Sequence, residues 1–393
     1  MSHWRPIAGA VLLDLAVSPL FAWAVFTPRL SRELGVDQPA LATVFSVGLA
    51  AFTVGVLVGG RLADRMAPRR LATICLVGTV AGLAGSSIAT SVTTLALTFG
   101  ITLGGSTGVG YATAVRVAGT AASRRGLGLS LVVSAYAAGT MVLAPTVTVL
   151  LHAFSRTTTM LILAGLAGVL LAVSVYLLPP QVTGGDSAQV PLRRPGPIPR
   201  AKVVALWVIF CLGSAPALAA FAQAGELVGN PRATTVAVAM LSAGNLAGRL
   251  IAGPLSDRIG TSPALHGNVA LLALACLPVA LGATGTPVLV SLLLLGTQYG
   301  ALSALVPAAT ASAVPAQRFG ATYGLVFTGW GLAGLVAPIA AASAADSVGV
   351  NGLSRVALGM AVLTWTAVIG YGLTSRQAGR KPARDRRGPG RCR

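Results

Sequence analysis

Twelve long apolar runs restrict this chain to one kind of fold, a set of helices that cross a lipid bilayer. Hydrophobic residues make up 54% of the 393 residues and charged residues only 9%, whereas soluble domains carry about 25% charged residues. A helix needs about 20 consecutive apolar residues to cross the hydrocarbon core. The runs lie at about 6–27, 39–60, 71–90, 95–118, 127–151, 159–179, 201–225, 233–255, 262–283, 287–312, 319–345 and 354–374. We therefore predict an all-α membrane protein with twelve transmembrane helices.

A motif that occurs twice divides the runs into two similar halves. The two copies end the second and the eighth run, and their aspartates are 193 residues apart. They read Gly60-Arg61-Leu62-Ala63-Asp64-Arg65 and Gly253-Pro254-Leu255-Ser256-Asp257-Arg258. A repeat of this length indicates a duplicated domain, and two similar halves are typical of many secondary transporters.

We expect these halves to fold as two pseudo-symmetric six-helix bundles. The N-terminal bundle covers residues 1–179 and the C-terminal bundle residues 201–374. The stretch 180–200 is polar and rich in Pro and Gly, which is typical of a flexible linker, here cytoplasmic. Residues 375–393 form a basic cytoplasmic tail.

The basic residues lie mostly on one side of the predicted membrane. We place 21 of the 28 Lys and Arg residues on the side of the chain termini, five on the opposite side and two inside helices. This positive-inside bias predicts a cell membrane, plasma or inner, with both termini cytoplasmic. The basic tail is then an orientation signal or a contact with anionic lipid, and the net charge of +19 does not indicate nucleic-acid binding.

The twelve runs and the duplicated motif resemble the major facilitator superfamily. In that superfamily the motif is a conformational gate at the cytoplasmic helix ends, between two bundles that alternate access to a central site. Each motif aspartate is placed to pair with an arginine or with the positive N-terminus of a neighbouring helix; a purely topogenic role is the alternative. The resemblance assigns the gate to Gly60, Asp64, Arg65, Arg69, Arg70, Gly253, Asp257 and Arg258.

A narrower resemblance is to the branch of oxalate/formate antiporters and monocarboxylate transporters. It rests on Phe-Ala-Trp-Ala-Val-Phe-Thr-Pro at 21–28, Asn245-x-x-x-Arg249 and Tyr323-Gly324. In that branch an arginine of the eighth run meets the substrate carboxylate, and the matching residue is Arg249. Oxalate transporters of the branch add a lysine in the eleventh run. This chain has Trp330 there, which favours a monocarboxylate over a dicarboxylate.

Arg249 is the leading candidate for substrate binding because it lies about two turns inside an apolar run. A guanidinium in lipid is costly unless it faces a cavity or a partner, and its planar fork of donors suits a carboxylate. Structural pairing with a group of the first, fifth or seventh run is the alternative. Other residues expected at the cavity, each with simple packing as its alternative, are Trp23, Tyr111, Tyr136, Gln298, Tyr299 and Trp330.

Asp14 is the one acidic residue well inside a run apart from the motif aspartates. It is a candidate for proton coupling or for an intramembrane ion pair. Arg116 in the fourth run is its expected partner, because both residues fall in the cytoplasmic half of the membrane.

These features predict a secondary active transporter for a small organic anion such as a monocarboxylate, working by alternating access. Proton coupling and antiport both stay open, and efflux of a hydrophobic or cationic compound is the alternative function. A third candidate function is that of a membrane receptor that does not transport its ligand. The sequence has no nucleophile set, phosphate loop or metal-ligand spacing, so we expect no enzyme and no cofactor. One chain suffices for the pathway, with the substrate and membrane lipid as partners.

Overall fold

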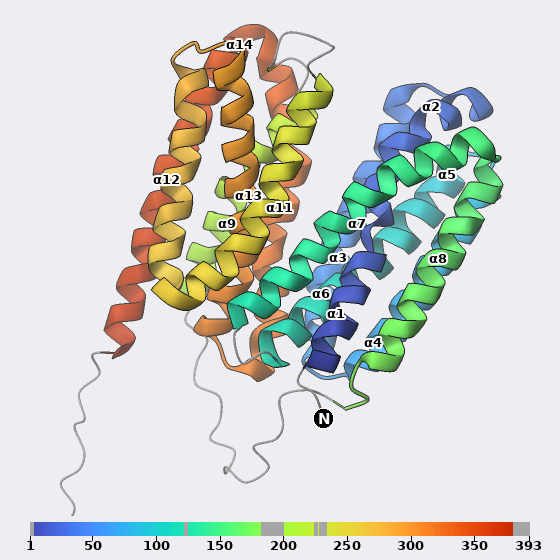
Figure 1. The fold of residues 1–393 in the computed structure, drawn as a ribbon, viewed down its shortest axis with the longest axis horizontal. Coiled ribbons are helices and arrows are strands. Elements are labelled where there is room, and N and C mark those ends of the chain that lie inside the picture. The colour runs from blue at the N-terminus through green and yellow to red at the C-terminus, as the bar shows by residue number, and fades with distance from the viewer. Residues whose placement is uncertain (1–3, 122–124, 182–199, 224–226, 228–233, 380–393) are drawn as a thin grey trace, which may run out of the picture.

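The computed structural model describes residues 4–121, 125–181, 200–223, 227 and 234–379. Within these residues, twelve helices are long and apolar enough to cross a membrane, and no strand occurs. The predicted fold class is therefore confirmed. Figure 1 shows two groups of helices, one formed by α1 to α8 and the other by α9 to α14.

The first group contains six spans, of which two are interrupted. In the first span, α1 and α2 are separated by η1, a 3₁₀ helix with a proline in its first turn that cannot continue the α-helical hydrogen-bond ladder. In the fourth span, η2 is a π-helix between α5 and α6. The elements are α1 (Trp4–Ala16), η1 (Ser18–Ala22), α2 (Trp23–Leu34), α3 (Gln38–Ala63), α4 (Pro68–Ser87), α5 (Val92–Leu95), η2 (Ala96–Leu103), α6 (Gly104–Ala121), α7 (Arg125–Ala153) and α8 (Arg156–Leu177).

The second group contains the other six spans. Its elements are α9 (Arg200–Ala222), α11 (Thr234–Ile259), α12 (Thr261–Ala280), α13 (Thr286–Ala313), η3 (Ala316–Arg318) and α14 (Phe319–Gly379). The last of these contains two spans, because the chain turns at Gly349, whose φ of 64° favours glycine. Most of the expected linker and tail, residues 182–199 and 380–393, lies outside the described residues.

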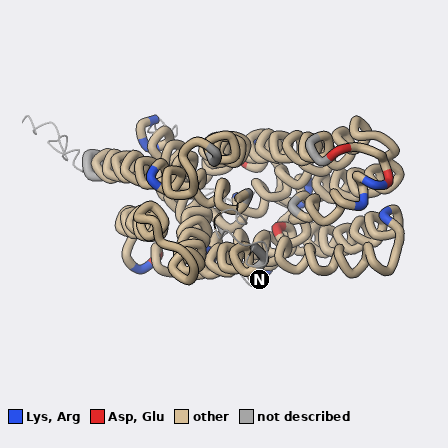
Figure 2. Tube along the Cα trace, turned by 90° about the horizontal axis from the view of Figure 1, so that it is seen from above, with Lys and Arg blue, Asp and Glu red and all other residues tan. Residues whose placement is uncertain are grey.

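Large apolar side chains remain exposed along the spans, as expected where lipid is the solvent. Val142, Val169 and Val362 are each more than 60% exposed. Charged residues take up little of the trace in Figure 2. Helices satisfy their backbone hydrogen bonds internally, so such apolar surfaces are stable in a bilayer.

Small residues allow close helix packing inside the first group. Gly104 and Gly108 on α6 face α3, where a β-carbon at either position would meet the backbone carbonyl oxygen of Gly48 or Phe52. Both helices belong to the same half. These glycines therefore serve packing within one bundle, in line with the expected role of small residues between membrane helices.

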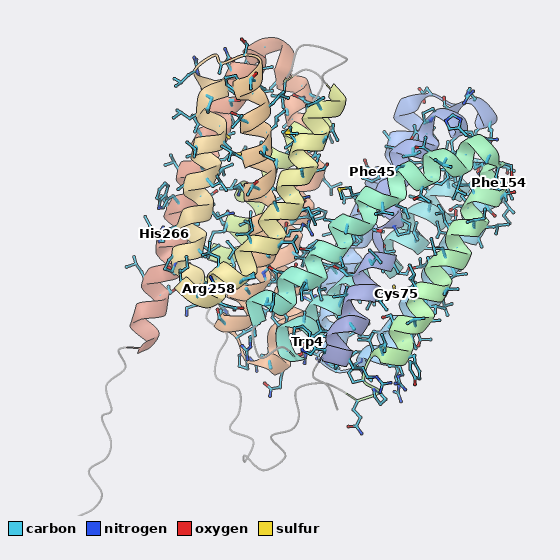
Figure 3. The ribbon with its side chains drawn as sticks, in the orientation of Figure 1. Trp4, Phe45, Cys75, Phe154, Arg258 and His266 are labelled. Atoms are coloured by element: carbon cyan, nitrogen blue, oxygen red, sulfur yellow. The ribbon has the colours of Figure 1, made fainter. Side chains whose placement is uncertain are left out.

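The two groups meet mainly through α3 against α14 and α7 against α11. Figure 1 shows that the groups converge at one end and diverge toward the other. Figure 3 places Trp4 and Arg258 toward the converging end and Phe154 toward the diverging end. The site described next lies between these two groups.

Candidate functional site

A small cavity lies between the two halves of the molecule. Its volume of about 30 Å³ leaves room for about two water molecules. Five of the residues expected at the cavity line it, namely Arg249, Tyr111, Tyr136, Tyr299 and Trp330. The full lining is Phe52, Tyr111, Tyr136, Phe210, Arg249, Tyr299, Ser303, Phe327 and Trp330.

Arg249 is the only charged side chain among the described residues that line this cavity. It is 7% exposed and comes from α11. Its Nε donates to Oδ1 of Asn245, one turn earlier on the same helix, at 2.9 Å. Its Nη1 donates to the backbone carbonyl of Val133 on α7 at 2.5 Å. The guanidinium thus lines the cavity and also bonds to the fifth span, so features of both alternatives for this residue are present.

Aromatic rings fill most of the space around the cavity. Phe52 lies among them, with ring centroids 5.7 Å from Tyr111, 6.1 Å from Tyr136 and 5.9 Å from Phe327. The first three residues belong to α3, α6 and α7, and Phe327 belongs to α14. Offset and edge-on ring contacts of this kind stabilise a packed cluster. The cluster therefore closes the space between the halves in this conformation.

Two hydrogen bonds tie the polar ends of these rings together. The hydroxyl groups of Tyr111 and Tyr323 are 3.1 Å apart, one from each half. Nε1 of Trp330 donates to the hydroxyl of Tyr299 at 2.8 Å. Both interactions are buried, so the site offers hydroxyl groups inside an otherwise apolar enclosure.

Asp14 is fully buried in α1, and neither of its carboxylate oxygens has a hydrogen-bond partner among the described residues. The expected partner Arg116 instead donates to Asp64 at 2.8 Å, because α6, which carries Arg116, packs along α3. The expected ion pair between Asp14 and Arg116 is therefore not formed.

Trp23 and Gln298 lie inside their own bundles and do not line the cavity. Nε1 of Trp23 donates to the carbonyl of Leu41 at 3.1 Å, and its ring lies 4.5 Å from that of Phe99. Nε2 of Gln298 donates to Oδ1 of Asn268 at 3.0 Å. Each side chain has a partner on the interior side of its helix, and this turns it away from the space between the halves.

The motif aspartates join the two halves at the converging end. Asp64 accepts hydrogen bonds from the backbone N–H groups of Gly320 at 2.9 Å and Ala321 at 2.7 Å, in the first turn of α14. These N–H groups have no partner within their own helix, and the helix dipole adds a favourable positive potential. The carboxylate therefore caps a helix of the opposite half.

Asp257 makes the symmetric contact. It accepts from the N–H groups of Gly126 at 2.9 Å and Leu127 at 3.0 Å, at the start of α7. The motif glycine lies one turn before each aspartate and lets the helices cross closely. A β-carbon at Gly60 would meet the carbonyl oxygen of Gly320, and one at Gly253 would meet that of Gly126.

Comparison with known families agrees with this twelve-helix arrangement. The sequence profile of the Major Facilitator Superfamily matches residues 10–338 and 208–389. The chain belongs to this superfamily. It is therefore a multi-pass membrane transporter of a small-molecule substrate, and not an enzyme.

A solved structure supports the fold of this transporter. The human organic anion transporter MFSD10 (TETRAN) matches with a TM-score of 0.68 and 15% sequence identity, over 94% of this chain and 100% of that one. At this identity the likeness concerns the fold alone. The comparison with curated proteins finds no match.

The motif arginines of the transporter take no part in the described capping contacts. Arg69 donates to the carbonyls of Leu178 and Tyr176 at 3.2 and 3.3 Å, and so holds the end of α8. No described hydrogen bond or ion pair joins the side chains of Arg65, Arg70 or Arg258 to the opposite half. Within each copy of the motif, the glycine and the aspartate contact the opposite half.

Sequence reasoning missed four residues of the cavity wall. Phe52, Phe210, Phe327 and Ser303 line it beside the expected ones. Phe327 follows Tyr323 by four residues and precedes Trp330 by three, a spacing that places all three on one helix face. This row of aromatic residues on one helix face was the sequence feature that could have identified Phe327 as a cavity residue. Phe52 and Phe210 occur in runs that are apolar on all sides, where no such signal exists.

Proposed function

We propose that this transporter moves a small organic anion, such as a monocarboxylate, by alternating access between its two halves. The observation that carries the proposal is the position of Arg249, the one charged side chain among the described residues of the cavity wall. A guanidinium at an enclosed, apolar site binds a carboxylate through two parallel hydrogen bonds. One cation matches a substrate with one negative charge.

The surrounding groups suit a small anion with an apolar body. Aromatic faces from Phe52 and Phe327 would enclose the body, and the hydroxyl groups of Tyr111 and Tyr299 would reach a second acceptor. The structurally similar human protein MFSD10 is an organic anion transporter, which agrees with this proposal without identifying the cargo.

Substrate binding requires the halves to move. A volume of about 30 Å³ is far below the 300–1,000 Å³ of typical small-molecule sites. We infer from the positive-inside bias that the converging end faces the cytoplasm. The conformation described here is then closed toward the cytoplasm by the capped aspartates. Release of Asp64 and Asp257 from α14 and α7 would open that side, so the two contacts act as a gate.

Efflux of a hydrophobic cation is the second candidate function, and Asp14 favours it. An ionised carboxylate without partners is costly to bury, and a cationic substrate would supply the missing partner. In that case Arg249 would serve only as the link to Val133 and Asn245. The two candidates therefore assign the substrate to different residues.

Uptake into proteoliposomes separates the two candidates. Wild-type protein should accumulate labelled monocarboxylates in a saturable way, and Arg249→Ala should abolish that uptake. Arg200→Ala is the matched control, because Arg200 is exposed at the start of α9 and lies about 15 Å along that helix from Phe210, its cavity residue. Size-exclusion chromatography would establish that each variant folds. Absence of carboxylate uptake by wild type, or an unchanged rate in Arg249→Ala, would refute the anion proposal.

A further inference from the structure

A second and larger cavity lies inside the C-terminal half. Its volume is about 310 Å³, and its walls come from α9, α12, α13 and α14. It shares no residue with the cavity around Arg249. On α13, for example, Ser291 and Leu295 line this space, whereas Tyr299 in the next turn lines the central one. The transport mechanism proposed above makes no use of it.

The N-terminal half fills the corresponding interior with large side chains. The outer part of its first span supplies Trp23, Phe26 and Leu30, each at most 3% exposed. Phe99 of the fourth span packs on the Trp23 ring at 4.5 Å. The first span of the C-terminal half, α9, contributes smaller groups to its cavity, such as Ala215 and Ala219. The space therefore arises from a difference in side-chain size between the two halves.

Two buried polar atoms at the cavity lack partners. Nε2 of Gln223 and Oγ of Ser291 have no hydrogen bond among the described residues. Gln223 is 8% exposed and Ser291 3%, and both side chains line the cavity. Buried polar groups are almost always hydrogen-bonded, and each exception calls for a reason. A ligand in the cavity would satisfy both groups.

We propose that this cavity is a binding site for a small, uncharged, largely apolar molecule that carries an acceptor oxygen, such as a compact aromatic ketone. The amide N–H of Gln223 would donate to that oxygen, and the hydroxyl of Ser291 would make a second hydrogen bond. The described lining residues include no Asp, Glu, Lys, Arg or His, so a charged ligand would find no counter-charge. The volume lies at the lower end of the range for small-molecule sites.

Benzophenone provides a direct test, because it is an uncharged aromatic ketone that forms covalent bonds with nearby C–H groups under near-ultraviolet light. The full-length protein would be labelled in lipid nanodiscs, and the adducts located by peptide mass spectrometry. We expect saturable labelling of the cavity-lining segments of α9, α12, α13 and α14. Uniform labelling of lipid-facing residues such as Val169, without saturation, would overturn the proposal.

Variants of the cavity wall sharpen this test. Ala219→Phe places a ring in the cavity, as the N-terminal half does, and should remove the saturable adducts. Val204→Phe is the matched control on the lipid-facing side of the same helix, where Val204 is 61% exposed; it should label like wild type. Gln223→Leu keeps a similar volume but loses the donor. It should raise the benzophenone concentration needed for half-maximal labelling by about fivefold, the effect of one hydrogen bond. This variant also serves if Ala219→Phe does not fold.

A lipid acyl chain could also occupy the cavity. Labelling in detergent and in lipid nanodiscs distinguishes this occupant from a ketone-like ligand. Saturable labelling in both detergent and nanodiscs would support a free ketone-like ligand. Labelling in detergent that disappears in nanodiscs would mean that an acyl chain fills the cavity, and the proposal would be wrong. Labelling that Gln223→Leu leaves unchanged would likewise refute the assigned hydrogen bond. None of these outcomes depends on whether the central cavity transports an anion.

Discussion

Replacing each motif aspartate by asparagine should open the converging end unequally. Asp64 has a side chain that is 7% exposed and accepts from two N–H groups of α14 and from Arg116. Asp257 accepts two hydrogen bonds from α7 but lies exposed. Water and salt screen the exposed contact more strongly. We therefore expect Asp64→Asn to shift the conformational equilibrium much more than Asp257→Asn.

The size of the shift follows from the hydrogen bonds between the halves. A hydrogen bond to a charged group contributes about 1.5 kcal/mol or more, so the two from α14 to Asp64 contribute about 3 kcal/mol. Asparagine keeps one oxygen and one neutral bond of about 1 kcal/mol, which leaves a loss of about 2 kcal/mol, or about 30-fold in population. For the exposed Asp257 the loss is about 1 kcal/mol or less, about fivefold. The bond from Arg116 lies within one half and does not enter this difference.

Spin-label distance measurements would read these populations. Labels at Arg70 on α4 and Ile259 on α11 would sit at exposed positions of opposite halves, near the converging end. The native cysteines to be replaced first are Cys75, Cys211, Cys276 and Cys392. Wild type should give mainly the short distance. Asp64→Asn should move a large fraction to a longer distance, and Asp257→Asn a small one.

Glu33→Gln is the matched control, because it also converts a carboxylate to an amide. Glu33 pairs with Arg29 and Arg156, both at 2.8 Å and both within the first half. Its distance distribution should equal that of wild type. Equal shifts for the two motif variants, or a shift in Glu33→Gln as large as that in Asp64→Asn, would refute the assignment of the gate to capped helix ends.

Two further variants test close packing and buried charge. Gly60→Leu should eliminate the short distance and transport together, because its side chain would meet the carbonyl of Gly320, while circular dichroism should show unchanged helix content. Arg156→Ala should lower the melting temperature, because this buried guanidinium donates to the carbonyls of Ser86 and Ala89 as well as to Glu33. Leaving two buried carbonyls without their donor costs about 3 kcal/mol. An unchanged thermal unfolding curve would contradict that reasoning.

The fold was predictable because it depends on length and composition. Twelve apolar runs and their boundaries agree with the described helices to within several residues, and the bilayer leaves helices as the only available element in such a chain. The interruptions were not predicted. The π-helix at Ala96–Leu103 and the 3₁₀ turn at Ser18–Ala22 depend on how neighbouring helices pack. That information is absent from an apolar run whose faces all look alike.

The candidate site was predictable where polarity marks a helix face, and not elsewhere. Arg249, Tyr111 and Tyr299 stand out in their runs and do line one cavity. Gln298 also stands out, but Asn268 on a neighbouring helix turns it into the bundle interior. Arg116 pairs with Asp64 because their helices are neighbours. The sequence shows how deep each residue lies in its run, but not which helices lie side by side.

We expect anion binding at Arg249 and proton binding at Asp14 to be coupled. Both side chains are buried, one in each half, and they carry opposite charges when ionised. An anion bound to Arg249 would offset the attraction between the guanidinium and the Asp14 carboxylate. Binding of a proton to Asp14 would then strengthen binding of the anion to Arg249, and the reverse, because such coupling is reciprocal.

We therefore expect wild type to carry protons inward with the anion, measured with a pH-sensitive dye trapped in proteoliposomes. Asp14→Asn, which loses no described hydrogen bond, should still exchange the anion but without proton movement. Equal proton movement in both proteins would show that coupling lies elsewhere, whereas exchange lost with the fold intact would give Asp14 a direct part in binding.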